Sequence, residues 1–269
     1  MQPWFEGPGG TNPDGGGPMA VLRERLAGLG EHLAALAFPR HCVACQRLLG
    51  PQANWCPPCW NELVITRQRP YCPTCGRPLG PHQRITRKKR CAGCENEPWV
   101  LAGLCLVGTY EPLLSEAIRN YKYNKHLHAG QVLAELLAGH LADRLWIEEV
   151  DVLVPVASHW SRIWRRGFDH TRLLVEHLAR RTGIPVLRVL ERTRATAPQV
   201  NLSATSRAEN ISGAFRTKSH MPLDGAVVCL VDDVMTTGAT IREAARALRG
   251  GGARRVYGAV IARAAVPRI

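Results

Sequence analysis

Four Cys-x-x-Cys pairs stand within the first 95 residues of this 269-residue chain, and they constrain the fold of that segment more than any other feature. Each pair forms a tight turn that directs two thiolates at one cation, and two such pairs complete a tetrahedral shell of four sulfurs. Four thiolates leave no open coordination position, which favours a structural role for the metal. We therefore predict two structural zinc ions, with the ligands Cys42, Cys45, Cys56, Cys59, Cys72, Cys75, Cys91 and Cys94.

The spacing of these cysteines leaves their pairing open. Joining each pair to the next one along the chain keeps both loops short, whereas an interleaved pairing is also possible. The N-terminus has no apolar stretch typical of a secretory signal, so metal binding is favoured over a disulfide framework. A redox-active pair is the minor alternative. Cys105 and Cys229 stand alone in apolar runs, and we expect both to be small buried hydrophobic residues.

The chain is strongly basic, and its cations are mostly arginine. It has 35 lysine and arginine residues against 22 acidic ones, a formal net charge of +13, and five of the 35 are lysines. The planar guanidinium group fits phosphate, so the charge favours a polyanionic partner or ligand, although a codon bias toward arginine would give the same composition. No apolar run reaches the ~18 residues of a membrane span, and we expect a cytoplasmic protein.

Composition divides the chain into four segments. Residues 1–18 are rich in glycine and proline and are expected to be a disordered tail, and residues 19–39 place leucines at spacings that predict an amphipathic helix. Residues 40–99 are the predicted double zinc ribbon, which is rich in turns and has little room for a core. In residues 100–269 apolar strands alternate with amphipathic helices, which predicts an α/β domain with a parallel sheet.

The chemistry is concentrated in the sequence VVCLVDDVMTTGAT, residues 227–240. Its apolar beginning, up to Val231, predicts a strand buried on both faces, with Asp232 and Asp233 at its carboxyl end. A loop of threonine and glycine, a helix and a second apolar strand follow and complete a β-α-β unit. Because ligands of open α/β sheets bind at the carboxyl ends of the strands, we expect the binding site here.

The residue types in this loop indicate a phosphorylated sugar diol as the ligand. Gly238 and Ala239 let the backbone approach a ligand closely, and Thr236, Thr237 and Thr240 add hydroxyl donors to the N–H groups that attract phosphate at a helix start. The two acidic residues before the loop would repel phosphate, so sugar hydroxyls or Mg²⁺ suit them better. A Walker B strand lacks its GxxxxGK[ST] partner here, and a GxGxxG fingerprint is absent. An acidic helix-capping turn would not explain the acids and the loop together.

This stretch resembles the phosphoribosyl-pyrophosphate (PRPP) motif of type I phosphoribosyltransferases, in which apolar residues precede two acids and a loop of threonine and glycine. With the four cysteine pairs, three further segments are similar to the ComF family of competence-associated proteins: YEPLLSEAIRNYKY (110–123), VLVPVASHWSRIWRRGFDHTRLLVEHLA (152–179) and RTRATAPQVNLSATSRAENISGAF (192–215). The resemblance implies a type I phosphoribosyltransferase-like parallel sheet flanked by helices, preceded by a small double zinc ribbon.

The resemblance also implies roles for single positions. Asp232 and Asp233 would hold the ribose 2- and 3-hydroxyls of PRPP, and the loop from Thr236 to Thr240 would cradle the 5-phosphate. The turn that would face pyrophosphate is Pro155, Val156, Ala157 and Ser158, and the matching substrate or mobile-loop positions are Arg166, Gly167, Gln199, Arg207 and Asn210. Where the family commonly reads RGFNQ, this chain reads RGFDH, so an acid and a histidine replace two amides and a hydrogen-bonding role there stays open.

The function that the resemblance implies is binding of PRPP, or a related phosphorylated sugar, with Mg²⁺, by a protein that acts in DNA uptake and natural competence. It would handle incoming single-stranded DNA in the cytoplasm, including at the inner face of the membrane. The partners implied are single-stranded DNA and a DNA-uptake helicase or other competence proteins. The alternative is an active phosphoribosyltransferase that transfers phosphoribosyl from PRPP to a nitrogen base, which the sequence does not identify.

Four residues near this site also have structural interpretations. Lys122 is expected to be either solvated or in contact with phosphate or nucleic acid, and His170 is expected to be satisfied or exposed more than catalytic. Trp160 and Trp164 stand four residues apart, and we expect them to pack in the core or in an interface. Stacking on single-stranded nucleic acid is the alternative, because arginines are interleaved with them.

Overall fold

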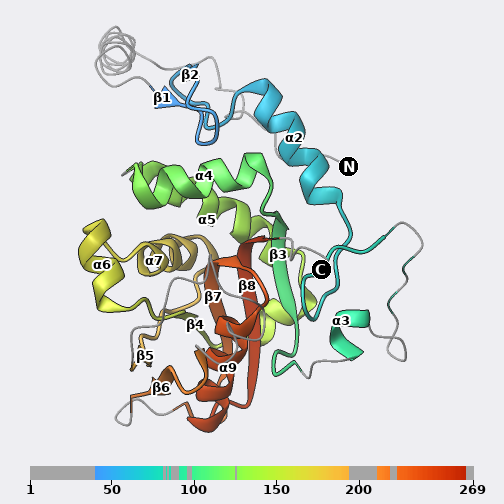
Figure 1. The fold of residues 1–269 in the computed structure, drawn as a ribbon, viewed down its shortest axis with the longest axis vertical. Helices are drawn as coiled ribbons and strands as arrows, with labels where there is room; N and C mark the ends of the chain where they lie inside the picture. Colours follow the sequence, from blue (N-terminus) through green and yellow to red (C-terminus); the bar gives the residue numbers. More distant parts are fainter. Residues whose placement is uncertain are drawn as a thin grey trace, which may run out of the picture.

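The computed structural model of the chain (Figure 1) describes residues 40–80, 83, 85, 91–95, 99–124, 126–193, 211–218 and 223–264. The predicted disordered tail, the predicted amphipathic helix, and the three loop positions Gln199, Arg207 and Asn210 lie outside these residues. Within the described ranges, no helix combines the length and the apolar character that a membrane crossing requires.

A four-stranded parallel sheet lies at the centre of the larger domain (Figure 1). Its strand order is β3-β8-β7-β4, and all three pairs of neighbours are parallel. The strands are β3 Leu104–Thr109, β4 Val152–Pro155, β7 Val227–Met235 and β8 Arg255–Arg263. Helices cover both faces of the sheet, which explains why its strands are continuous apolar runs. The predicted α/β fold with a parallel sheet is confirmed.

Alternate residues of each strand pack into two separate cores. Cys229 and Val231 of β7 join one core with the first group of helices, whereas Val228 and Leu230 join the other core with the last helix. The first group is α4 Pro112–Tyr123, α5 Leu127–Ala142 and α7 His170–Thr182, and the last helix is α9 Ala239–Gly250. Cys105 and Cys229 are fully buried in the first core, as predicted.

Shorter elements complete this domain at its margins. A 3-10 helix, Leu145–Glu149, precedes β4, and α6 Trp160–Arg166 follows β4 at the outer edge of the molecule, beyond α7 (Figure 1). A small antiparallel pair, β5 Leu190–Arg192 and β6 Phe215–Thr217, lies beside α9. These margins matter because α6 and β5 both contribute residues to the site.

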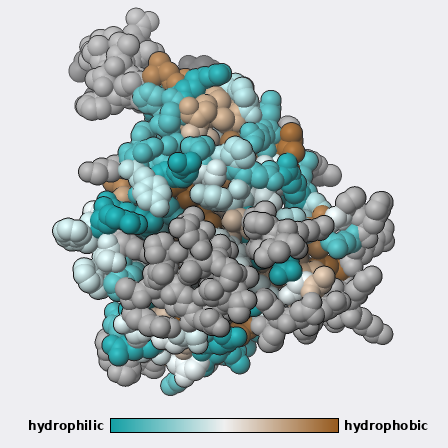
Figure 2. Space-filling view, in the orientation of Figure 1, coloured by the Kyte–Doolittle hydropathy of each residue, from teal (hydrophilic) through white to brown (hydrophobic). Residues whose placement is uncertain are grey.

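The cysteine-rich segment contains a helix that the sequence analysis did not predict. The elements are β1 Arg40–His41, β2 Leu48–Leu49, α2 Pro57–Gln68 and α3 Ala92–Glu95. Pro57 suits the first position of α2, because that position needs no N–H donor. The helix buries only Leu63 and Thr66, so it has no apolar stripe that a sequence pattern could reveal. In Figure 2 the coloured part of the visible face is largely hydrophilic, with small apolar areas scattered over it.

The second zinc ribbon, which contains Cys72, Cys75, Cys91 and Cys94, covers the outer edge of the central sheet at β3. On the side of β3 away from β8, the Leu104 N–H donates to the carbonyl of Pro73 at 2.7 Å, and the Leu106 N–H donates to the hydroxyl of Tyr71 at 3.0 Å. Both strand residues are almost fully buried. The edge strand β3 is thus hydrogen-bonded on both sides. Other sheets protect their edges by closing into a barrel or by placing a helix over the edge strand.

Candidate functional site

The site begins where β4 stops and β7 continues. β4 pairs with β7 only as far as Pro155 opposite Val231, whereas β8 accompanies β7 to its last residue, Met235. The strand therefore extends past Val231, where we expected it to end, because its ladder with β8 continues. Asp232 and Asp233 lie in this overhang with one strand edge free of β4, and successive side chains of a strand point to opposite faces.

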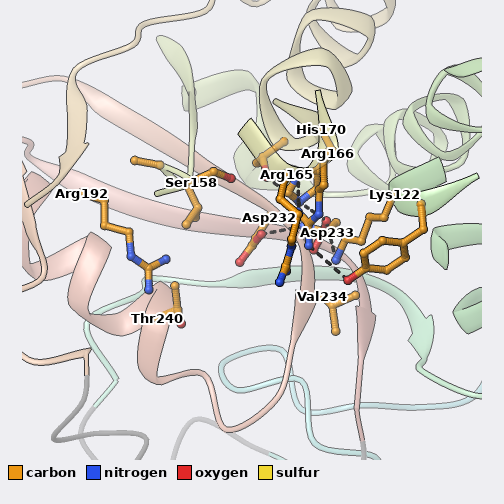
Figure 3. A pocket seen from close by; sticks show the side chains of 14 residues that line it. Lys122, Ser158, Arg165, Arg166, His170, Arg192, Asp232, Asp233, Val234 and Thr240 are labelled. Atoms are coloured by element: carbon orange, nitrogen blue, oxygen red, sulfur yellow. Dashed lines mark hydrogen bonds and ion pairs between the residues drawn. The ribbon is translucent and has the colours of Figure 1, made fainter. Parts of the chain in front are cut away.

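A cavity of about 260 Å³ opens onto this overhang (Figure 3). Its walls come from α4, the β4–α6 turn, α6, α7, β5, β7 and α9, so the topology gathers residues that are far apart in the sequence. Four of the lining residues are cationic. The complete lining is Lys122, Tyr123, Val156, Ala157, Ser158, Arg165, Arg166, His170, Thr171, Arg192, Asp232, Asp233, Val234 and Thr240.

Asp233 is buried and holds two basic partners. Its Oδ2 lies 2.8 Å from Lys122 Nζ and 2.8 Å from His170 Nε2, and the Asp233 residue is 4% exposed. Burial alone would raise the pKa of this carboxyl, but the charges and hydrogen bonds of Lys122 and His170 outweigh burial and hold the pKa well below its usual range. Lys122 is therefore neither solvated nor free, and both basic residues belong to the site.

Arg166 orients the histidine of this pair. Arg166 Nη1 lies 2.8 Å from His170 Nδ1 and 3.2 Å from His170 Nε2, so the guanidinium group contacts the ring whose Nε2 lies 2.8 Å from Asp233 Oδ2. The RGFDH segment thus retains hydrogen bonding at both changed positions: Asp169 caps α7 by accepting from the Arg172 N–H, and His170 holds Asp233. Asp169 and His170 therefore both make hydrogen bonds in this chain, although they replace the two amides that are common in the family.

Asp232 differs from its neighbour in exposure and in charge. It is half-buried in the cavity wall, and its Oδ1 accepts the backbone N–H of Asp233 at 2.9 Å. Burial, together with the negative charge of Asp233, raises the pKa of Asp232 to about 7, although Lys122 opposes part of this increase. At neutral pH the two acids therefore have different roles available: Asp233 is a fixed anion, and Asp232 gains or loses a proton.

The loop after β7 is shaped by one glycine and one tryptophan. Gly238 has a φ of +85°, and a Cβ at this position would lie 2.3 Å from Cη2 of Trp99. The Arg242 guanidinium lies 5.2 Å from the Trp99 ring centroid on this side of α9. Of the five predicted loop residues, Thr240 lines the cavity, while Thr237 accepts the N–H of Ala239 where α9 begins. Trp99 was not predicted to belong to the site, because it stands in no periodic sequence pattern.

The structure also places the predicted residues of the β4–α6 turn and of α6. Val156, Ala157 and Ser158 line the cavity directly after Pro155 ends β4, and Gly167 ends α6 with a φ of +83°. Arg165 and Arg192 line it as well, and Arg192 lies on the other side of Asp232 from Lys122 (Figure 3). Trp160 and Trp164 were expected to pack in the core or in an interface. Packing in the core is wrong, because they are 71% and 84% exposed, and packing in an interface stays a prediction.

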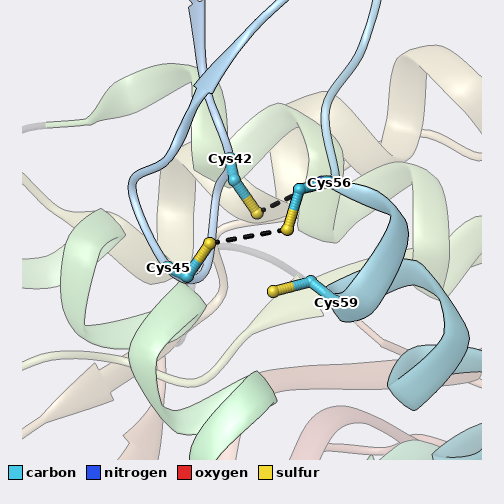
Figure 4. Close-up of side chains that lie close together, drawn as sticks. All are labelled: Cys42, Cys45, Cys56 and Cys59. Atoms are coloured by element: carbon cyan, nitrogen blue, oxygen red, sulfur yellow. Dashed lines mark hydrogen bonds between the residues drawn. The ribbon is translucent and has the colours of Figure 1, made fainter.

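The eight cysteines form two clusters that fit zinc, and Figure 4 shows the first of them. Cys42 and Cys45 meet Cys56 and Cys59, and Cys72 and Cys75 meet Cys91 and Cys94, with all sulfurs of a cluster within 4.8 Å of one another. Sulfur separations of 3.5 Å, 3.8 Å and 3.4 Å occur in these clusters. Zinc–sulfur bonds of about 2.3 Å in a tetrahedron place sulfurs ~3.8 Å apart. The clusters are structural zinc sites, and the pairing is the sequential one.

Each zinc cluster is hydrogen-bonded to a buried side chain beside the cavity. Asn120, two residues before Lys122 on α4, donates to the carbonyls of Val43 and Ala44 at 3.0 Å and 2.8 Å. Arg263, opposite Met235 at the end of β8, donates to the carbonyl of Cys75 and is 3% exposed. The two cysteine turns therefore support α4 and the end of β7 from outside the cavity.

Comparison with known proteins agrees with this architecture. A family model described as a double zinc ribbon domain matches residues 33–95, and one described as a phosphoribosyl transferase domain matches residues 122–268, which is more than half of the chain. The DNA utilization protein YhgH of Salmonella typhi is 34% identical, over 81% of this chain and 94% of that protein.

Two further relatives carry competence names. Competence protein F of Haemophilus influenzae is 30% identical, over 79% of this chain and 92% of that protein. Competence protein ComFC of Bacillus subtilis is 28% identical, over 75% of this chain and 80% of that protein. With its double zinc ribbon, its phosphoribosyl transferase domain and relatives aligned over 80% to 94% of their length, the chain belongs to the ComF family.

Proposed function

We propose that this protein binds PRPP, or a related phosphorylated sugar, in the cavity at the overhang of β7, and that it acts in the uptake or use of incoming DNA. The observation that carries the ligand is the pair of unlike carboxylates, one fixed by Lys122 and His170 and one half-buried in a wall that also holds Arg165 and Arg192. Such a cavity offers acceptors for a diol beside cations for phosphate groups.

We expect the ligand to bind in the cavity in a single orientation. A ribose hydroxyl would donate to Asp232, and the second hydroxyl to Oδ1 of Asp233, because Oδ2 is already occupied by its basic partners. The 5-phosphate would meet the N–H groups at the start of α9, beside Thr240 in the cavity wall. The pyrophosphate would face the turn at Ala157 and Ser158. Mg²⁺, held by Asp232 and the diphosphate, would neutralise part of that charge.

The DNA part of the proposal is supported by the relatives, which are named for DNA utilization and for competence. It is also supported by the net charge of +13. Binding of single-stranded DNA by the full chain, with an affinity that falls as salt rises, is the result expected from this charge. Absence of binding at low salt would overturn this part of the proposal and leave the sugar-phosphate site untouched.

Replacing Asp232 with asparagine should weaken the binding of PRPP in the presence of Mg²⁺ by roughly 10- to 100-fold, because it removes a charged hydrogen-bond acceptor. Titration calorimetry measures this directly. The matched control is Asp143→Asn, an exposed acid at the end of α5 that does not line the cavity. Equal affinity in the wild type and Asp232→Asn would contradict the proposed site.

A second experiment separates binding from catalysis. Release of pyrophosphate from PRPP with a panel of bases would add catalysis to binding, and binding without turnover would favour a sensor.

The affinity for PRPP with Mg²⁺ should also rise with pH around neutrality. The raised pKa of Asp232, about 7, means that its ionised fraction grows from about a tenth at pH 6 to about nine tenths at pH 8. The ionised form is the one that accepts hydroxyl hydrogen bonds and binds a cation. We expect a gain of roughly 10-fold over this range, after subtraction of the profile of Asp232→Asn, which contains the titration of the ligand itself. A profile identical in both proteins would contradict this assignment.

A further inference from the structure

The outer side of α6 presents two tryptophans to solvent. Trp160 and Trp164 are 71% and 84% exposed, and their spacing of four residues places them on one side of the helix. Exposed indole rings are unfavourable in water and are enriched where proteins contact ligands or partners. The neighbouring Ile163 is half-buried.

Arginines accompany these rings on α6, and the helix itself contains no acidic residue. The helix sequence WSRIWRR contains three arginines and no acidic residue. Arg165 is exposed and lines the cavity mouth, about 100° around the helix from Trp164. Tyr123, 58% exposed at the same mouth, has the Arg166 guanidinium 5.2 Å from its ring centroid. Aromatic faces and positive charge therefore alternate from the outer side of α6 to the cavity.

We infer that this aromatic–basic surface, made of Tyr123, Trp160, Trp164 and Arg165, binds single-stranded DNA by stacking on its bases. The inference rests on the DNA part of the proposed function and names the surface that carries it. Stacking on an indole needs a base with a free face, which a single strand offers and a duplex interior does not. A strand laid over the two tryptophans would bring its phosphates to Arg165.

The same features disfavour other occupants. A second copy of the chain would bring together two strongly basic surfaces, because the net charge is +13 and α6 has no acid to pair with the arginines of its partner. A lipid surface needs a longer amphipathic helix than the seven residues of α6. Charge complementarity therefore favours the polyanion with exposed aromatic bases.

The test is fluorescence anisotropy of a labelled oligothymidine of about 20 nucleotides, titrated with the full chain. Trp160→Ala and Trp164→Ala should each weaken binding by roughly 10-fold, since stacking contributes that much per base. Trp160→Phe and Trp164→Phe should retain most of the affinity. Trp60→Ala, which removes a tryptophan 40% exposed on α2, is the matched control and should bind like the wild type.

Salt and PRPP make the outcomes distinct. Arg165→Gln should reduce the dependence of the affinity on salt, whereas the tryptophan variants should keep the same slope. The tryptophan variants, which do not line the cavity, should still bind PRPP, which shows that they are folded. If the wild type binds the oligonucleotide and the double tryptophan variant binds it equally well, the surface is misassigned while the proposed function stands. A change in self-association or in binding to anionic lipid vesicles, with DNA affinity unaltered, also overturns the inference. If the wild type does not bind DNA, both this inference and the proposed role in handling DNA fail.

Discussion

Lys122→Met should lower the free energy of unfolding by about 3 kcal/mol at pH 7, because it leaves the buried carboxylate of Asp233 without its ammonium partner. Urea denaturation of the zinc-loaded protein measures the change. Lys122→Arg keeps the charge and should lose much less. The double variant Lys122→Met/Asp233→Asn removes both charges and should recover a large part of the lost stability, because the cost lies in the unpaired charge.

The sign of the pH dependence follows from the carboxylate. Because the pKa of Asp233 is held below its usual value in the folded protein, the pair stabilises the fold above about pH 4, and this contribution is lost as the pH falls. The stability difference between the wild type and Lys122→Met should therefore shrink in acid. A small difference at pH 7 would mean that His170 alone satisfies Asp233. A difference that stays constant from pH 7 to 3 would mean that the cost of the substitution does not come from this carboxylate.

Loss of zinc from either cluster should weaken PRPP binding, although none of the eight cysteines lines the cavity. Asn120 and Arg263 donate to carbonyls of the cysteine turns, so a turn that opens leaves a buried polar side chain without its acceptors. Cys72→Ser/Cys91→Ser should lose one zinc per chain and lower the melting temperature by roughly 10 °C or more. The PRPP affinity should fall with it.

The two clusters should differ in what they disturb. The first supports α4 and hence Lys122, whereas the second supports Met235 and the end of β8 next to the loop at Gly238. Metal analysis and calorimetry of Cys45→Ser/Cys59→Ser and Cys72→Ser/Cys91→Ser separate them, with Cys229→Ala as a buried cysteine that should leave the metal content unchanged. Full PRPP affinity in a variant that has lost a zinc would show that the ribbons are independent of the cavity.

The local parts of this architecture were predictable from the sequence. The strand before Asp232, the glycine loop and the following helix are neighbours along the chain, so their residue types and order define the β-α-β unit. The cysteine clusters were predictable for the same reason, because each turn is only four residues long. Which cysteine pairs share one zinc ion could be decided only from the structure.

The long-range parts were not predictable, because they depend on which elements meet. Lys122 ends α4 and His170 begins α7, and nothing in either segment indicates that both face Asp233. Trp99 packs on Gly238 across more than half of the chain. The exposure of Trp160 and Trp164 also depends on the place of α6 at the margin of the molecule, whereas their spacing alone equally fits a buried face.

The second ribbon has a further consequence for how the chain can be divided. Leu104 and Leu106 on β3 give their outward N–H groups to Pro73 and Tyr71, so a fragment that starts at residue 100 would bare an apolar sheet edge. Bare edges of this kind recruit strands from other molecules and lead to aggregation. The zinc-binding segment therefore covers an edge strand of the transferase-like half, although the two segments have separate sequence signatures.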